Sequence, residues 1–393
     1  MRKAPYWRSW IPTSRQIRHA MAARVPIVSP WLARQLNCTA FNPAWSRAAT
    51  LLYQQNQPQE LSLSPSTRVF FEAHGQLERA RYGQIVPSAK DNFTLYDLGA
   101  GYIYGHTGAA YSFAAKGQTR EIGANTARLR RLKTRRLNGR ALNFMGLQSG
   151  HRHYYHFLMD YLPYLLTVLQ DFAWQNEPLT LVVRPDLSPM QERLFAYLCE
   201  FYPKLNLLKL ANNNRLEAVH IWQLNYDNPC EFRRPASKEK AELLRKTVLA
   251  AFEVSPCSEP WRKLYISRAD ARIRNLLNEA EFLPQLKSRG FEIIRAAELS
   301  IKAQLKLFDE ARLVVAPHGA GLTNMLFTQN GGAVIELFPG DYVQSAFAWL
   351  ATVKEHQYTP ILGERSQAHQ HFTLSDKAQG DLLAACDTLL EHI

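Results

Sequence analysis

Short apolar runs alternate with helix-length segments through the last third of the chain. The apolar runs have the length of buried strands and stand at 263–268, 291–296, 313–316 and 333–338. The segments between them have helical composition and stand at 278–289, 301–311 and 322–327. Strands that alternate with helices predict a parallel sheet, so we expect an α/β domain over residues 261–393 that closes with a helix at 380–393.

The alternation also occurs earlier in the chain. Strand-like runs stand at 179–185, 206–210 and 218–224, and a helix is expected at 190–201. Residues 61–145 differ, because glycine and period-two alternation, starting at 67–75, predict short antiparallel strands. We therefore expect a first α/β domain over 61–255, a linker marked by Pro256, Ser258 and Pro260, and a separate extension over 1–60.

A glycine loop follows the apolar run 313–316. Its sequence is PHGAGLTN; Thr323 and Asn324 are expected to cap the short helix that follows, and Gly331 and Gly332 to close it. Glycines let the backbone approach a bulky anion, and free N–H groups at a helix start favour phosphate. The alternative interpretation is a tight turn that has only a structural role and binds no ligand.

An acidic residue near the end of the next strand strengthens the first interpretation. Glu336 can accept hydrogen bonds from ribose hydroxyls, because ligands of open parallel sheets lie beyond the carboxyl ends of the strands. The dinucleotide fingerprint is only half met, since Asn324 stands where the third glycine is required. The candidate nucleotide-binding residues of this segment are His318, Gly319, Ala320, Gly321, Asn324 and Glu336.

Three arginines lie at and after the end of the strand-like run 263–268. Arg268 is the last residue of this run, and Arg272 and Arg274 belong to the loop before the next helix. The planar guanidinium group binds phosphate oxygens with two parallel hydrogen bonds. A solvated loop is the alternative, but these arginines and the glycine loop are expected at the same edge of the sheet, which favours phosphate.

The segment GHRHYYHFLMDYLPYLL, residues 150–166, carries the strongest chemistry of the first domain. On a helix, His153, His156 and Asp160 lie on one face together with Phe157 and Tyr164. A carboxylate four residues from a histidine is a candidate general base. Two alternatives stay open, a structural helix pair and a metal site. Pro163 is expected to bend or end the helix soon after Asp160.

The net charge of +13 resides in two segments. Residues 1–59 contain eight basic and no acidic residues, and residues 120–140 carry +7, so the remainder carries −2. The first segment mixes its bases with aromatic and aliphatic residues, which predicts peripheral contact with an anionic membrane. The run 126–140 lacks interleaved aromatic residues, so nucleic acid is not an expected partner.

The cysteine pattern bears on the compartment. The five cysteines are scattered and never spaced as C-x-x-C. No apolar run reaches the roughly 20 residues of a membrane helix, and no apolar core follows the basic N-terminus. We expect a cytoplasmic protein that contacts the inner face of a membrane through residues 1–59.

Several of these motifs together resemble glycosyltransferase family 61. They are HYYHF-x2-DYLP, ISR-x3-R-x-R-x3-NE, LF-x2-A-x-LVVAPHGAGLTNMLF and IELFP, over about residues 150–339. The resemblance is to members that assemble bacterial capsule or surface polysaccharide. It implies a GT-B architecture, with two Rossmann-like domains facing across a cleft, a nucleotide-sugar donor and inversion at the anomeric carbon. Tyr164 and Ala303 depart from the family pattern.

The residues and the resemblance agree on a mechanism. Arg268, Arg274, His318 and the amides near Gly319 and Gly321 are expected to hold the diphosphate, and Glu336 and Asn324 the ribose or base. Asp160, oriented by His153 or His156, is expected to take the proton of a glycan acceptor hydroxyl. The chain lacks the D-x-D pair of metal-dependent transferases, so no metal cofactor is expected. The alternatives are a metal-dependent hydrolase using His153, His156 and Asp160, and a non-catalytic protein that binds nucleotide or polyanion.

Overall fold

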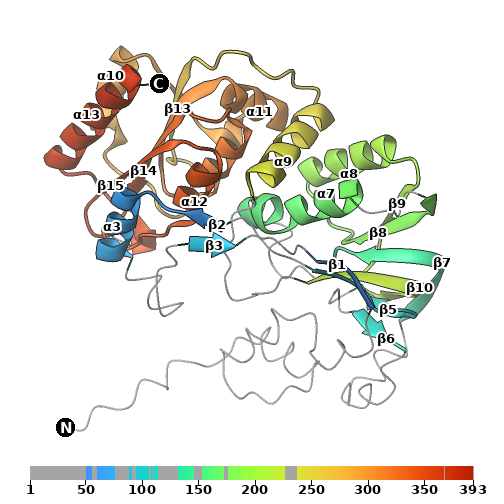
Figure 1. Cartoon of the computed structure of the whole chain (residues 1–393). Helices are drawn as coiled ribbons and strands as arrows, with labels where there is room; N and C mark the ends of the chain where they lie inside the picture. Colours follow the sequence, from blue (N-terminus) through green and yellow to red (C-terminus); the bar gives the residue numbers. More distant parts are fainter. Residues whose placement is uncertain are drawn as a thin grey trace, which may run out of the picture.

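The structure is a computed structural model. It describes residues 50–54, 60–75, 88–90, 94–105, 108, 110–113, 132–145, 153–171, 176–225, 237–366 and 368–392 (Figure 1). The predicted extension over 1–60 and its membrane contact therefore lie almost wholly outside the described residues, as does the basic run 120–131.

The second half is built on a five-stranded parallel sheet, as the alternation predicted. Its strands are β11 (Arg262–Ile266), β12 (Phe291–Ile294), β13 (Ala311–Pro317), β14 (Ala333–Phe338) and β15 (Gln357–Leu362). They lie in the order β12-β11-β13-β14-β15. The chain thus steps outward to β12 and then crosses back past β11 to β13, which makes the boundary between β11 and β13 the topological switch point.

Helices cover both faces of this sheet. They are α10 (Glu279–Ser288), the short η6 (Ala296–Glu298), α11 (Ile301–Asp309), η7 (Ala320–Phe327), α12 (Ala346–Val353), η8 (Ala368–Gln370) and α13 (Asp376–His392). Leucines of α10 and α13 share one hydrophobic cluster with Val315 and Ile335, whereas α11, η7 and α12 pack with Val314 and Val334 on the other face (Figure 1). Ser300 caps α11 as expected, accepting the Ala303 N–H at 3.2 Å.

The first half contains a mixed sheet. Its strands are β1 (Thr50–Gln54), β4 (Thr94–Asp97), β5 (Gly101–Tyr104), β6 (Ala110–Ser112), β7 (Lys133–Asn143), β8 (Leu179–Val183), β9 (Leu205–Lys209) and β10 (Asn214–Asn225). The neighbours β10, β7, β8 and β9 are parallel, and β1, β4, β5 and β6 join antiparallel. Helices α7 (Leu162–Asp171), α8 (Pro189–Phe201) and α9 (Lys238–Ala251) cover one face (Figure 1).

Two expectations for the N-terminal part of this half are wrong. The run expected as a strand at 67–75 forms most of helix α3 (Pro65–His74), because Pro65 suits the first helical position and the Ser64 hydroxyl accepts the Thr67 N–H. The helix packs on the second sheet, where the Phe71 ring stacks on Tyr358 with centroids 6.5 Å apart. The second expectation was short antiparallel strands throughout residues 61–145, but residues 133–143 form the long strand β7, which is parallel to both β10 and β8. A small pair, β2 (Glu60–Ser62) with β3 (Ser88–Lys90), completes this region.

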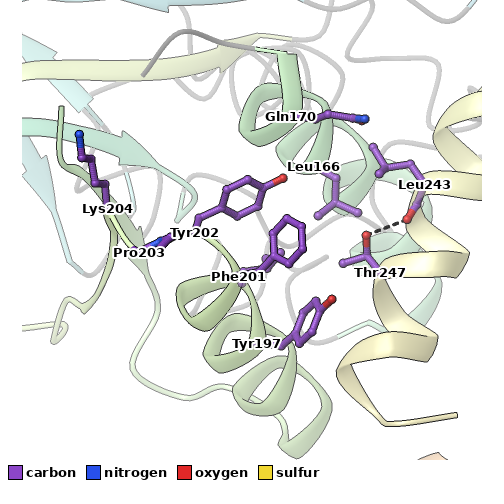
Figure 2. A pocket seen from close by; sticks show the side chains of 10 residues that line it. Leu166, Gln170, Tyr197, Phe201, Tyr202, Pro203, Lys204, Leu243 and Thr247 are labelled. Carbon is purple, nitrogen blue, oxygen red and sulfur yellow. Dashed lines mark hydrogen bonds between the residues drawn. The ribbon is translucent and has the colours of Figure 1, made fainter. Parts of the chain in front are cut away.

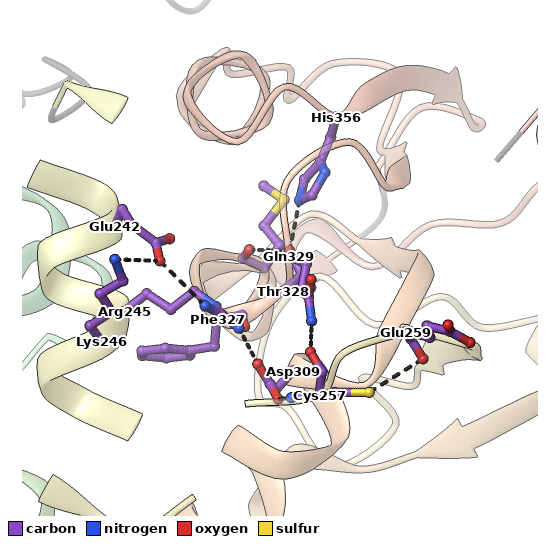
Figure 3. Close-up of polar contacts among 11 residues, drawn as sticks. Glu242, Arg245, Lys246, Cys257, Glu259, Asp309, Phe327, Thr328, Gln329 and His356 are labelled. Atoms are coloured by element: carbon purple, nitrogen blue, oxygen red, sulfur yellow. Dashed lines mark hydrogen bonds and ion pairs between the residues drawn. The ribbon is translucent and has the colours of Figure 1, made fainter. Parts of the chain in front are cut away.

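The two halves share one hydrophobic cluster and a buried ion pair. The cluster contains Leu181 and Leu244 of the first half together with Val314 and Leu326 of the second. The guanidinium group of Arg245 on α9 pairs with the carboxylate of Asp309, and its Nε also donates to the carbonyl of Phe327 at 3.0 Å (Figure 3). The halves are therefore held against each other at the end of η7. No described helix is both long and apolar enough to cross a membrane.

Candidate active site

Arg268 lies against the glycine loop at the switch point of the second sheet. A β-carbon on Gly319 would overlap the Arg268 guanidinium group, so only glycine allows this approach. Carbonyls of its own loop orient that group, which donates from Nη2 to Ile273 at 3.0 Å and from Nε to Arg274 at 3.4 Å. The loops after β11 and β13 thus meet where ligands of open parallel sheets bind.

A buried carboxylate fixes the start of the arginine loop. Glu279, at the start of α10, accepts hydrogen bonds from the Tyr265 hydroxyl at 2.9 Å and the Ser267 hydroxyl at 2.6 Å. Its Oε1 also lies 3.4 Å from the backbone nitrogen of Arg268. Glu279 was not predicted as a site residue, although it belongs to the N-E pair that ends the arginine motif.

Arg274 adopts the left-handed conformation, with φ of 58°. Its backbone N–H donates to the carbonyl of His369 at 3.0 Å, and its guanidinium carbon lies 5.0 Å from the centre of the Tyr342 ring. The Nε atom of Arg274 and the Oδ1 atom of Asn275 are buried and have no hydrogen-bond partner among the described residues. Buried polar atoms without partners indicate a place where a ligand completes the bonding. Arg272 is exposed to solvent.

The two arginines make this edge of the sheet strongly positive. Burial, together with the charge of Arg274, lowers the pKa of Arg268 from 12.5 to about 10. The group still carries its charge at neutral pH, but the charge is poorly solvated. An anion bound here would stabilise both guanidinium groups.

His318 and Glu336 are in direct contact. Glu336 was expected at the exposed end of its strand, but it is 0% exposed, because both faces of β14 are covered. One carboxylate oxygen is 2.5 Å from Nδ1 of His318, and the other accepts the Tyr358 hydroxyl. Glu336 therefore lies on the buried side of the sheet edge, in contact with His318 and away from solvent. The predicted contact with a ribose would have to compete with these two hydrogen bonds.

The helix after the glycine loop is tighter than expected. Residues 320–327 form the 3₁₀-helix η7, preceded by Gly319 without a side-chain cap, so Thr323 and Asn324 do not cap it. Asn324 lies 1% exposed and instead joins the halves. Its Oδ1 accepts the Tyr154 hydroxyl at 2.5 Å, and its Nδ2 donates to Gln304 at 3.0 Å. A ribose or base at Asn324 would have to displace one of these partners.

The predicted base lies on an interrupted helix. The short α6 (Tyr154–His156) leads into a π-helical turn, η4 (Phe157–Tyr161), before α7 begins at Leu162. Pro163 was expected to bend or end the helix, yet the helix continues to Asp171. Proline cannot donate to the carbonyl four residues earlier, that of Met159, and the wide turn next to it accommodates the missing bond. Asp160 lies within this turn.

Asp160 and His156 are hydrogen bonded. The Oδ2 atom of Asp160 is 2.5 Å from Nδ1 of His156, and the Asp160 side chain is 14% exposed. Burial raises the pKa of Asp160 above its ordinary value, although the contact with His156 acts in the opposite direction. The ring of His153 lies 4.6 Å from that of His156. Partial burial, then His156 and Arg274, lower the pKa of His153.

These contacts bring the predicted base and the predicted diphosphate site together. The ring of Phe347 lies 5.5 Å from both Tyr155 and His318, so one aromatic side chain separates the two segments. The Tyr154–Asn324 hydrogen bond links the same two segments. The charge of Arg274 reaches both His153 and Glu336. The two predicted groups of residues therefore lie close to each other, where the two halves meet.

A sequence comparison identifies the family. Residues 154–335 match the family model described as Glycosyltransferase 61. The match over this segment supports assignment to glycosyltransferase family 61. The family 61 match begins at Tyr154, directly before the Asp160 turn, and includes the arginine and glycine loops. The match supports a glycosyltransferase activity in general. No curated protein matches the chain.

Besides Glu279, four residues that contact the candidate site were not predicted from sequence. Tyr154 and Asn275 lie next to predicted residues, and their proximity in the chain was the available signal. Tyr342 lies in the segment after β14. Tyr358 lies in β15, a strand that was not predicted from the sequence. Only the fold brings these two rings to the arginine loop and to Glu336.

Among the described residues, neither a group of metal-ligating side chains nor the pocket found in the first half coincides with this site. Within the described ranges, no three histidine, cysteine, aspartate or glutamate side chains gather as metal ligands would. A pocket of about 570 Å³ lies between α7, α8 and α9, where Tyr197, Phe201 and Tyr202 face Leu166 and Leu243 (Figure 2). No predicted site residue lines this pocket, and Lys204 is its one charged lining residue.

Proposed function

We propose that the protein is an inverting glycosyltransferase of GT-B architecture that uses a nucleoside-diphosphate sugar, in particular a UDP-sugar, without a metal ion. The observation that carries the proposal is the contact of Arg268 with Gly319 at the switch point of the second sheet. An arginine held against a glycine, with Arg274 beside it, is suited to two linked phosphates. Arginines and amide groups can stabilise a leaving diphosphate as a metal ion does.

The donor would lie along the carboxyl edge of the second sheet. Arg268, Arg272 and Arg274 would supply positive charge. The backbone N–H groups of residues 319–321, at the start of η7, would donate hydrogen bonds to the phosphate oxygens. His318 lies within this group, between the rings of Phe338 and Phe347. Asn275, whose Oδ1 has no partner among the described residues, is suited to accept a hydrogen bond from the nucleoside.

Asp160 would act as the general base. The acceptor hydroxyl loses its proton to Asp160 while its oxygen forms the bond to the anomeric carbon. The bond from that carbon to the diphosphate oxygen breaks on the opposite face, and the electron pair leaves with the nucleotide. His156 orients Asp160 and shares its proton, and His153 completes the acceptor side. A raised pKa improves the carboxylate as a base near neutral pH.

The acceptor would be a saccharide, and the pathway the assembly of a surface polysaccharide such as a capsule. The family 61 resemblance supports this part of the proposal. The scattered cysteines, never spaced as C-x-x-C, support a cytoplasmic location. Contact with the inner face of a membrane through residues 1–59 is supported by their charge of +8. None of these residues takes part in the chemistry proposed for Asp160.

A panel of donors tests the proposal. Purified protein is incubated with UDP-, GDP- and CDP-sugars and saccharide acceptors in EDTA, and the released nucleotide is measured. We expect release with one nucleotide family, an inverted anomeric product, and no effect of EDTA. Asp160→Asn is the matched control, because it removes the proposed general base and should abolish most of the nucleotide release that depends on transfer. Release that requires a divalent metal, or a product of retained configuration, would contradict the mechanism.

A further inference from the structure

Three polar side chains, of which two are buried and Tyr358 is half-buried, form a diagonal across the second sheet. In the registers of the parallel strands, Ala316 lies opposite Glu336, and Val334 lies opposite Tyr358. Side chains two residues apart share a face, so Glu336 and Tyr358 lie on the same face of β14 and β15, and His318, directly after β13, continues that face. Their hydrogen bonds follow this diagonal, from the His318 ring to one carboxylate oxygen and from the Tyr358 hydroxyl to the other.

Aromatic rings fix the orientation of the His318 ring. Phe338 stacks on it at 5.2 Å, and the rings of Tyr342 and Phe347 lie 5.7 and 5.5 Å away. The titratable and charged groups around the pair are Tyr358 from β15, Tyr342 from the segment after β14, and Arg274 from the loop after β11. The other neighbours from α12 and α3, Phe347 and Phe71, are apolar. The ring therefore keeps Nδ1 on Glu336.

Proton counting decides what the second ring nitrogen can do. If the pair shares one proton between Glu336 and Nδ1, the remaining hydrogen of the imidazole is on Nε2, wherever the shared proton resides. If that proton is lost, the neutral ring directs its hydrogen from Nδ1 to the carboxylate, and Nε2 becomes an acceptor. Complete burial raises the pKa of Glu336 well above its ordinary value, although Tyr358 and Arg274 act in the opposite direction. Burial of the carboxylate therefore favours keeping the shared proton between Glu336 and His318.

We infer that Glu336, held by Tyr358, is a positioning residue that makes Nε2 of His318 a hydrogen-bond donor to the diphosphate of the nucleotide. Negative charge grows on the leaving diphosphate as the bond to the anomeric carbon breaks. A donor at Nε2 stabilises that charge, whereas an acceptor would repel it. The inference rests on the proposed function only for the identity of the anion, and the tautomer can be measured without one.

The direct test is the tautomer of His318 in the full chain without nucleotide. The histidine rings are labelled with ¹⁵N, the His318 signals are assigned with His318→Phe, and the spectra are followed with pH. At pH 7 we expect Nε2 to be protonated and Nδ1 to be hydrogen bonded. In Glu336→Gln the midpoint of the His318 titration is expected to fall by at least about one pH unit, because an amide does not hold the extra proton.

Glu279→Gln is the matched control, because Glu279 is also buried in the second half and accepts a tyrosine and a serine hydroxyl. It should leave the His318 titration unchanged. A neutral Nδ1–H tautomer at pH 7, or the same midpoint in Glu336→Gln, would overturn the inference. Thermal unfolding of each variant shows whether it is folded.

A second measurement separates this inference from the proposed function. UDP is titrated into the wild type and into His318→Phe, which keeps the stacked ring but has no Nε2 donor. We expect binding to weaken about 10- to 100-fold, the worth of one charge-assisted hydrogen bond. UDP binding that is equal in the two proteins would contradict the role of Nε2. If no nucleotide binds the wild type, the proposed function fails, while the tautomer result still tests Glu336.

Discussion

In the second half, the charged groups follow the strands of a parallel sheet, whereas in the first half they lie on a helix whose hydrogen-bond ladder is interrupted. Arg268 and Gly319 stand where β11 and β13 end, and the position of the edge is set by strand pairing. Asp160 stands in a π-helical turn beside Pro163, and its direction depends on how that turn packs. One side of the site is thus fixed by topology and the other by local helix geometry.

This difference predicts that the second half controls nucleotide binding and that the Asp160 turn of the first half controls turnover. Groups at the sheet edge are positively charged and meet a glycine loop, so changes there should weaken nucleotide binding. The Asp160 turn carries no positive charge of its own apart from its histidines, so changes there should lower turnover and spare binding. A variant that mixes the two effects would show that the halves do not act separately.

Asp160→Asn should produce the largest effect. Loss of a general base typically lowers turnover about 10²- to 10⁴-fold, and UDP binding should stay unchanged. Steady-state rates and UDP titration measure the two quantities separately. In the wild type, the rate should rise with pH through the pKa of Asp160, since the base acts only when deprotonated. Burial puts this rise above the ordinary value of 3.8. Weakened UDP binding in Asp160→Asn would contradict the claim that the Asp160 turn acts in turnover and not in nucleotide binding.

Arg245→Ala should have the largest effect on stability. Its partner Asp309 is 1% exposed, so the variant leaves a buried carboxylate without its guanidinium and should cost about 3–5 kcal/mol of unfolding free energy. Lys246→Ala on the same helix is the control, because Lys246 is 71% exposed and should cost no more than about 1 kcal/mol. Figure 3 shows both side chains on α9. Denaturant unfolding that gives equal losses would refute a bridging role for Arg245.

Gly319→Ala and Gly321→Ala form a matched pair at the glycine loop. A β-carbon at Gly319 would overlap Arg268, whereas one at Gly321 would meet Ile266 at an ordinary 3.5 Å. Both variants keep their backbone N–H groups. We expect UDP binding to weaken about 10- to 100-fold only in Gly319→Ala, because the Arg268 guanidinium must move. Calorimetric titration that shows equal affinities would indicate that Arg268 does not contact the nucleotide.

Tyr154→Phe should have the smallest effect. It removes one hydrogen bond between the halves and leaves the buried Oδ1 of Asn324 without its donor, which costs about 1–3 kcal/mol of unfolding free energy. Tyr197→Phe, in the pocket of Figure 2, is the control and should change little. Thermal unfolding measures both. No loss in Tyr154→Phe would mean that this bond does not hold the halves together.

The sequence predicted the second half well because its strands are short and apolar and its helices have recognisable ends. The run 333–338 coincides with β14, and Ser300 caps α11 as expected. Helix α12 was not predicted, because AFAWLATV is apolar on nearly every side and a helix that is almost wholly buried shows no amphipathic period.

The first half was harder to predict because its local signals conflict with its tertiary contacts. β7 begins with exposed charged residues, which oppose the assignment of a central strand. The polar part pairs with β10 alone, and only the apolar end, from Arg140, also pairs with β8. For the site, spacing predicted the His156–Asp160 contact, but the burial of Glu336 depends on β15, which lies over 20 residues further along the chain.

The central claim is that the arginine and glycine loops bind one diphosphate. The most direct test is the melting temperature in EDTA with increasing UDP, for the wild type, Arg274→Ala and Arg295→Ala. Arg295 follows β12 at the same sheet edge but pairs only with Glu298 among the contacts that the described residues show, so it serves as the control. We predict that saturating UDP raises the melting temperature of the wild type and of Arg295→Ala, and that Arg274→Ala loses this shift. No shift in the wild type with any nucleoside diphosphate, or an equal shift in Arg274→Ala, would contradict the claim.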